Sequence, residues 1–226
     1  MATTVKFKIN TEKELEYLHQ FAKVCGTSKI KPEHLGLLSL DKDVAIKAIE
    51  EGYKKQEFIE FVKQLKKEWK NIEGEYFQKI KEFTGFDWKY KTYTCYISLS
   101  VPGLGDIFDG KYNKMILSNI LPAKIMKYVL AHELFHLHYF NVCKKGKMSA
   151  KAVSTGVNES IPILLMVANP ELSKLWSDIT LDKVRNSYPE VNRIIDPLLD
   201  FYKTEKDFKK LIEKAVELNE QAVPAS

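Results

Sequence analysis

The sequence has no hydrophobic run that could cross a membrane. None of its 226 residues lies in a stretch that approaches 18 consecutive apolar residues, the length that a helical span requires. The N-terminal residues also lack the basic end and following apolar segment that mark a secretory signal. We therefore expect a cytoplasmic protein without a membrane span.

Cysteine is scarce as well. The three cysteines, Cys25, Cys95 and Cys143, are odd in number, lie far apart and form no C-x-x-C pair. This pattern argues against a disulfide framework and fits a reducing compartment. The cysteine pattern therefore favours a cytoplasmic location, as does the lack of a secretory signal.

Arginine is nearly absent, although the chain carries a net charge of +5. Only Arg185 and Arg193 are arginines among the 35 basic residues, and the lysines of residues 54–91 alternate with acidic residues. Such alternation is typical of solvated helix faces, whereas a phosphate-binding surface gathers its cations in one place. We expect no nucleic-acid partner.

The sequence does contain a pattern of amphipathic helices around a few short strands. Alternating apolar residues predict strands over 4–9 and 88–99, and residues 115–117 are a candidate for another short strand. Apolar residues at helical spacing predict helices over 11–25, in two short segments within 32–51, as one long or two consecutive helices within 54–83, and over 122–142, 150–168, 171–187, 190–203 and 205–221. The predicted fold class is α+β, predominantly α-helical with a small β-sheet.

The N-terminal region, residues 1–88, has clear helix signals of its own. Thr11 and Glu14 have the spacing of a capping box at the start of the first helix, and Gly26 is placed to end it. The chemically distinctive residues all come later. We therefore predict a boundary near residue 88, with residues 1–88 forming either a separate domain or a lid over a cleft in residues 89–226.

Three of the five histidines lie within seven residues, in the segment A-H-E-L-F-H-L-H-Y. His132, Glu133 and His136 match H-E-x-x-H, of which about 0.01 instances are expected by chance in a chain of this composition. Four residues advance a helix by about 400°, so the two imidazoles lie on one face, one turn apart, where they can hold one Zn²⁺. Glu133 lies about 100° from His132, where a carboxylate can bind a water held by the metal.

The helix that carries this motif is apolar on nearly every side between residues 125 and 140. Such a helix is buried, and two histidines with a glutamate inside a protein need partners or a metal to offset their desolvation. A pair of hydrogen-bonded core histidines is the alternative to a metal site.

A zinc site needs a further ligand, because catalytic sites usually carry three from the protein. His138 lies about 200° from His136, on the wrong face, so we expect it to pack or to support the site. Cys143 is about 10.5 Å from His136 along the helix axis, which is too far. The remaining possibility is that the third ligand comes from another helix. Glu159, a lone carboxylate at the start of an apolar helix, is the best candidate, although it could instead cap that helix.

The motif together with the Asn158–Glu159 pair resembles the gluzincin metallopeptidases. These enzymes combine H-E-x-x-H on one helix with a glutamate ligand on a following helix, frequently preceded by asparagine. The resemblance implies that His132, His136 and Glu159 bind one Zn²⁺ per chain and that Glu133 is the general base.

The resemblance covers about residues 90–170 and implies a zincin-like architecture for residues 89–226. In this group a strand upstream of the active-site helix typically pairs with an extended substrate. The residues of the matching segment here are Tyr93, Cys95 and Ile97.

Two residues depart from the family pattern. Thermolysin-like members have an aspartate where this chain has Ile163, and Pro162 disturbs the helix just after the expected ligand. The family commonly adds a tyrosine or histidine that stabilises the oxyanion of the reaction. The candidates for this role and for contacts that support the ligands are Tyr188, Tyr202, His138 and Asn158.

These observations predict a zinc metallopeptidase in which Glu133 takes a proton from a metal-activated water that attacks the scissile carbonyl. The expected partner is a peptide or protein substrate, and we make no prediction of oligomeric state. Two alternatives stay open. One is a metal-binding pseudo-enzyme or protein-interaction module, and the other is a regulatory protease specific for one partner protein.

Overall fold

The computed structural model describes residues 2–28, 30, 32–101, 104–105, 111–176, 178–187 and 191–222. The chain divides into two compact units. Unit 1 comprises Met1–Glu73 and Tyr90–Glu133, and unit 2 comprises Gly74–Lys89 and Leu134–Ser226. Each unit therefore contains two separated stretches of sequence, and the last passage from one to the other occurs inside helix α6 (Ala123–Gly146).

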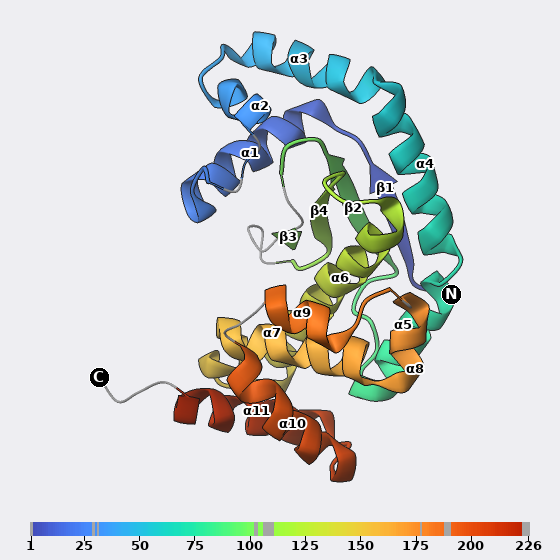
Figure 1. Cartoon of the computed structure of the whole chain (residues 1–226), viewed down its shortest axis with the longest axis vertical. Coiled ribbons are helices and arrows are strands. Elements are labelled where there is room, and N and C mark those ends of the chain that lie inside the picture. The colour runs from blue at the N-terminus through green and yellow to red at the C-terminus, as the bar shows by residue number, and fades with distance from the viewer. Residues whose placement is uncertain are drawn as a thin grey trace. The chain divides into compact units, whose positions relative to one another are not determined.

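Unit 1 is built on a small sheet with the strand order β1-β2-β4-β3 (Figure 1). Strands β1 (Thr4–Lys8), β2 (Thr92–Ser98) and β4 (Lys114–Ser118) are parallel, and the short β3 (Leu104–Gly105) is antiparallel to β4. Parallel neighbours need long connections, and the connection from β1 to β2 contains the first helices of the chain.

Strand β2 lies between two neighbours. Its register pairs Cys95 with Phe7 on one side and with Met115 on the other. The side chains of Tyr93, Cys95 and Ile97 are buried. Contrary to our prediction, this segment does not offer an edge to an extended substrate, because its backbone groups already bond to β1 and β4.

The helices of unit 1 cover the sheet and supply most of its core. They are α1 (Thr11–Cys25), α2 (Pro32–Leu35), the 3₁₀ helix η1 (Gly36–Leu38), α3 (Lys42–Lys54), α4 (Gln56–Lys70) and the first half of α6. Apolar residues of α1 and α3 pack with Ile116 of β4, since each helix turns one apolar stripe inward. The predicted end of the first helix is confirmed at Gly26, whose φ of 77° is a conformation that glycine adopts without strain.

Unit 2 is entirely helical in its described residues. It contains α5 (Glu73–Thr84), the second half of α6, the 3₁₀ helix η2 (Ala150–Val153), α7 (Thr155–Ile163), the π-helical turn η3 (Leu164–Ala168), α8 (Pro170–Ser173), the 3₁₀ helix η4 (Lys174–Trp176), α9 (Leu181–Ser187), α10 (Asn192–Thr204) and α11 (Phe208–Ala222). Helices α10 and α11 lie side by side, and both contact α7 (Figure 1).

This mostly helical structure with a small sheet confirms the predicted α+β class. Other predictions differ from the structure. The helix expected over 171–187 is broken into α8, η4 and α9. The boundary expected near residue 88 is not followed, because β1 pairs with β2 and most of α5 belongs to unit 2.

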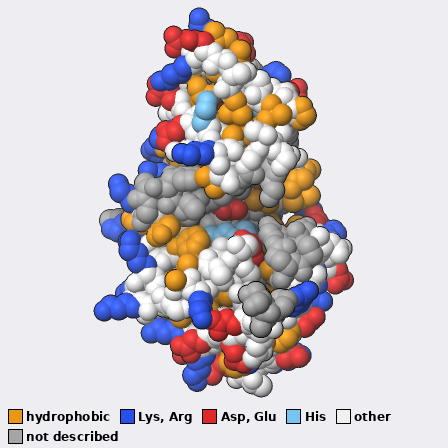
Figure 2. Space-filling view, turned by 90° about the vertical axis from the view of Figure 1, so that its left-hand side faces the viewer, with side chains coloured by type: hydrophobic (Ala, Val, Ile, Leu, Met, Phe, Trp, Pro, Cys, Tyr) orange, Lys and Arg blue, Asp and Glu red, His pale blue; other side chains and the backbone are white. Residues whose placement is uncertain are grey.

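The described surface and interior bear on the remaining sequence expectations. No helix among the described residues is long and apolar enough to cross a membrane. Cys95 and Cys143 are buried free thiols. On the face shown in Figure 2, basic and acidic side chains are interspersed.

A buried carboxylate, Glu14, ties helix α1 to the end of strand β2. Only 2% of Glu14 is exposed. Its Oε1 accepts hydrogen bonds from the Ser98 hydroxyl (2.8 Å), the Leu99 N–H (3.1 Å), the Ser100 N–H (2.9 Å) and the Ser100 hydroxyl. Its Oε2 accepts from the Tyr53 hydroxyl at 2.9 Å. Burial and the neighbouring carboxylate raise the pKa of Tyr53, so its hydroxyl stays a donor.

Glu14 therefore does not belong to a capping box. The N-cap of α1 is Asn10, whose Oδ1 accepts the N–H of Lys13 at 2.8 Å. The spacing of Thr11 and Glu14 matched a local motif, but the carboxylate is satisfied by Tyr53, 39 residues away in the sequence, and by residues more than 80 away.

We expect Glu14→Ala to lower the free energy of unfolding by about 3 kcal/mol or more, because several buried donors lose a charged acceptor. Urea denaturation measures this loss. Glu16→Ala is the matched control, since Glu16 lies on the same helix in an exposed ion pair with Lys13 and should cost less than about 1 kcal/mol. Equal losses in the two variants would contradict a structural role for the Glu14 contacts.

Candidate metal centre

Helix α6 is the scaffold of the site. It begins just after Pro122, whose carbonyl accepts from the N–H groups of Ile125 and Met126, and it extends a turn beyond the predicted end, to Gly146. Its apolar side chains are buried around most of the helix. Lys144 and Lys145 occupy the last turn, where cations complement the negative end of the helix dipole.

The structure brings His132, His136 and Glu159 together. The two histidines lie one turn apart on α6 and are 4% and 6% exposed, and Glu159 comes from α7. A ligand atom from each of the three residues lies within 4.8 Å of those of the other two. The group is therefore compatible with a metal site, as the sequence predicted.

The surroundings of His136 are those of a ligand fixed by its neighbours. Its Nδ1 lies 3.0 Å from Oδ1 of Asn158, and its Nε2 lies 3.4 Å from Oε1 of Glu159. An amide oxygen only accepts hydrogen bonds, so Nδ1 carries the proton and donates it to Asn158. Nε2 is then the ring nitrogen that faces the Glu159 carboxylate, and a cation could lie between these two atoms.

The spacing of these atoms suits a tetrahedral ion. Ligand atoms about 2.0–2.1 Å from Zn²⁺ and at the tetrahedral angle are roughly 3.4 Å apart. The distance between Nε2 of His136 and Oε1 of Glu159 has this value, 3.4 Å. This nitrogen and this oxygen therefore have the spacing that two ligands of one such ion would have.

Helix α7 is held in place by a close approach of α11. A Cβ on Gly156 would clash with Oδ1 of Asn219 and would lie 3.3 Å from Cδ1 of Ile194. The Nδ2 group of Asn219 also lies 3.4 Å from the Ser154 hydroxyl. Because Gly156 is within one turn of Glu159, this packing fixes the start of the helix that carries the third residue of the site. No sequence signal identified Gly156, since its partner is 63 residues away.

Glu133 differs from His132 and His136 because its side chain is partly exposed to solvent. It is partly exposed, and among the described residues it forms no hydrogen bond or ion pair. It lies near Cys95 of β2, where burial, with a smaller contribution from the Glu133 charge, raises the pKa of the thiol. An accessible carboxylate beside the first histidine can accept a proton from water.

His138 does not have the oxyanion role that was one possibility from the sequence. It is fully buried in unit 2, where its ring lies 4.4 Å from that of Trp88 and its Nε2 lies 3.0 Å from the Thr84 hydroxyl. Burial lowers the pKa of His138 to about 3, so the imidazole is neutral. A side chain without exposed surface cannot touch a substrate. It is a packing residue, as the helical angle suggested.

The other candidate residues have different positions. Asn158 contacts His136, as described above. The hydroxyl of Tyr202, on α10, accepts a hydrogen bond from Nδ2 of Asn169 at 3.1 Å, and burial raises its pKa. Tyr188 lies outside the described residues.

Comparisons of the chain with protein families, curated proteins and solved structures find no match. The interpretation of the site therefore rests on its residues and their geometry.

We expect the purified chain to bind one Zn²⁺, and we expect His132→Ala, His136→Ala and Glu159→Ala each to lose stoichiometric binding, because each removes a ligand. Elemental analysis after dialysis measures the bound metal. His19→Ala is the control, because His19 is an exposed histidine of helix α1. Normal zinc content in Glu159→Ala would place the third ligand elsewhere.

We expect Asn158→Ala to weaken zinc binding by about 10–100-fold, because the hydrogen bond that orients His136 is lost. Asn158→Asp retains an acceptor for the Nδ1 proton and should bind zinc at least as well as the unsubstituted chain. Competition with a chromophoric chelator gives both affinities. Equal weakening in the two variants would show that the residue acts through packing rather than through the hydrogen bond.

Proposed function

We propose that this protein is a zinc-dependent peptidase with a zincin-like catalytic region. The observation that carries the proposal is the convergence of His132, His136 and Glu159 next to an accessible Glu133. Two histidines and a carboxylate are the ligand set of one class of catalytic zinc site. The support for this assignment is the geometry of these residues together with the H-E-x-x-H spacing.

Zinc fits the donor set better than harder cations. Magnesium and calcium prefer oxygen ligands, whereas imidazole nitrogen suits zinc and its neighbours in the transition series. The near-burial of His132 and His136 favours a resident ion, since an isolated pair of imidazoles beside a carboxylate would be costly to desolvate. When bound, Zn²⁺ would acidify a water molecule and polarise a carbonyl oxygen.

Metal binding, orientation of a ligand and proton transfer would be carried out by different residues of the chain. His132, His136 and Glu159 would hold the ion, and Asn158 would keep the His136 ring in one tautomer and orientation. Glu133 would take the proton of the attacking water and then pass it to the leaving amine. For this transfer the carboxylate must be close to water and not engaged in an ion pair, as is the case for Glu133 among the described residues.

Asn158 would compensate for a departure from the thermolysin-like pattern. The position at which those enzymes have an orienting aspartate is Ile163, which is fully buried here. Asn158 reaches the Nδ1 atom of His136 from the residue just before the ligand Glu159. The contact that orients the His136 ring therefore comes from α7, the helix that carries both Glu159 and Ile163, but from a different turn than Ile163.

Glu133→Gln should reduce hydrolysis of a quenched-fluorescence peptide library by at least about 10²-fold while leaving the zinc content unchanged, because the amide cannot accept the proton of water. Rate and zinc content are measured on the same samples. Glu171→Gln, which alters an exposed carboxylate of α8, should retain full activity.

Two outcomes would overturn the assignment. Full activity in Glu133→Gln would exclude this residue as the base. Zinc-loaded protein that cleaves no member of the library and no protein isolated with it would instead indicate a metal-binding module without peptidase activity.

A further inference from the structure

A pocket of about 400 Å³ opens in unit 2 beside the last turns of α6. One wall comes from residues 86–89, which follow α5, and the other from α6 itself. The rings of Phe86 and Trp88 and the side chain of Val142 supply apolar surface. Small-molecule sites typically combine such surface with a few polar groups and have volumes of roughly 300–1,000 Å³.

The indole of Trp88 is a rigid part of this pocket. Its Nε1 donates to the carbonyl oxygen of Phe77 at 2.9 Å, and its ring packs edge-on against the Phe77 ring at 4.7 Å. The His138 ring lies 4.4 Å away within unit 2. Contacts with two buried rings hold the indole in one orientation while leaving it partly exposed. A fixed aromatic surface of this kind favours a ligand that also has a ring.

The rim of the pocket is positively charged. Lys89, Lys144 and Lys145 line it together with a single acid, Asp87. Asp87 already forms an ion pair with Lys81 at 2.6 Å, and the hydrogen bond and charge of Lys81, with a smaller contribution from Lys145, lower its pKa, so its charge is compensated. Lys144 forms no ion pair among the described residues. The excess of lysine therefore selects for an anionic group on the ligand.

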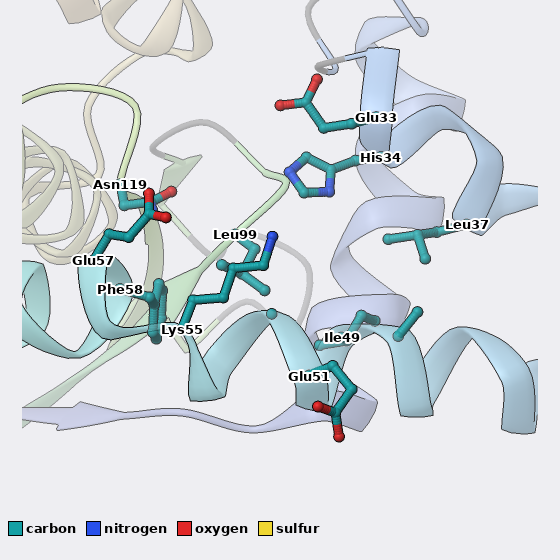
Figure 3. Close-up of a pocket in the computed structure, with 12 residues that line it drawn as sticks. Glu33, His34, Leu37, Ile49, Glu51, Lys55, Glu57, Phe58, Leu99 and Asn119 are labelled. Carbon is teal, nitrogen blue, oxygen red and sulfur yellow. The ribbon is translucent and has the colours of Figure 1, made fainter.

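The charge of the rim distinguishes this pocket from the one in unit 1 that Figure 3 shows. That pocket, of about 440 Å³, is lined by Glu33, Glu51 and Glu57 as well as by Lys55 and His34. Groups of both signs around one cavity do not define a ligand class. In the unit 2 pocket the aromatic walls and the lysine rim together indicate one ligand class, an anion that carries an aromatic ring.

We propose that the pocket beside the end of α6 binds an aromatic carboxylate. The ring lies against Phe86 and Trp88, and the carboxylate lies toward Lys144 and Lys145. The same chemistry is present in a free aromatic acid and in the C-terminal aromatic residue of a peptide. This site is separate from the histidine–glutamate group and does not depend on the proposed peptidase activity.

Isothermal titration of the full chain with 2-naphthoate tests the proposal. We expect saturable binding that weakens with added salt, and at least about tenfold weaker binding of the neutral 2-naphthamide. N-acetyl-Gly-Gly-Phe with a free carboxylate distinguishes the two sources, because it binds only if the pocket accepts a peptide end. The proposal is overturned if 2-naphthamide binds as well as 2-naphthoate, or if no binding occurs at about 1 mM ligand.

A pair of charge-reversal variants locates the site. Lys144→Glu/Lys145→Glu should weaken 2-naphthoate binding by roughly tenfold or more. Lys67→Glu/Lys70→Glu is the matched control, since it makes the same charge change in the last turn of α4, and it should leave the affinity within about twofold. Equal affinities in the two variants would place the ligand elsewhere. If charge reversal lowers the melting temperature below the assay range, Lys144→Ala/Lys145→Ala should still weaken binding relative to Lys67→Ala/Lys70→Ala.

Discussion

The burial of helix α6 is the constraint on which the rest of the structure depends. The helix is apolar on almost every side, so it can exist only where other elements cover it. Its first half belongs to unit 1, which contains the sheet, and its second half belongs to the helical unit 2. The same burial takes His132 and His136 nearly out of water, and their polar atoms must then find partners within the protein. The chemistry of the site is thus a consequence of how the core is built.

Much of the site could be predicted because its geometry is local. The four-residue spacing of His132 and His136 determines their common face on any α-helix, and the same rule placed His138 on the opposite side. Glu159 could be singled out because a lone carboxylate in an apolar helix needs an explanation. The role of Asn158 remained open, since its contact with His136 depends on how α7 lies against α6.

Features that depend on distant contacts could not be read from the sequence. The spacing of Thr11 and Glu14 is a sound local signal, but burial against Ser98 and Ser100 outweighed it. The alternation in residues 92–98 identified a strand without revealing that both of its edges are paired. The break in the helix expected over 171–187 and the tight contact at Gly156 likewise depend on tertiary packing, which local periodicity does not encode.

The pairing of β1 with β2 has a consequence for the order in which the chain assembles. Strand β1 leaves the ribosome before its partners, because β2 follows only after more than 80 further residues and β4 later still. During that interval helices α1, α3 and α4 can form locally, while the first strand has no partner. The sheet, and with it the surface of unit 1 that packs with α6, is therefore completed only after Ser118 has been synthesised. A nascent chain halted before residue 92 would expose an unpaired strand, a natural binding target for chaperones that recognise extended segments.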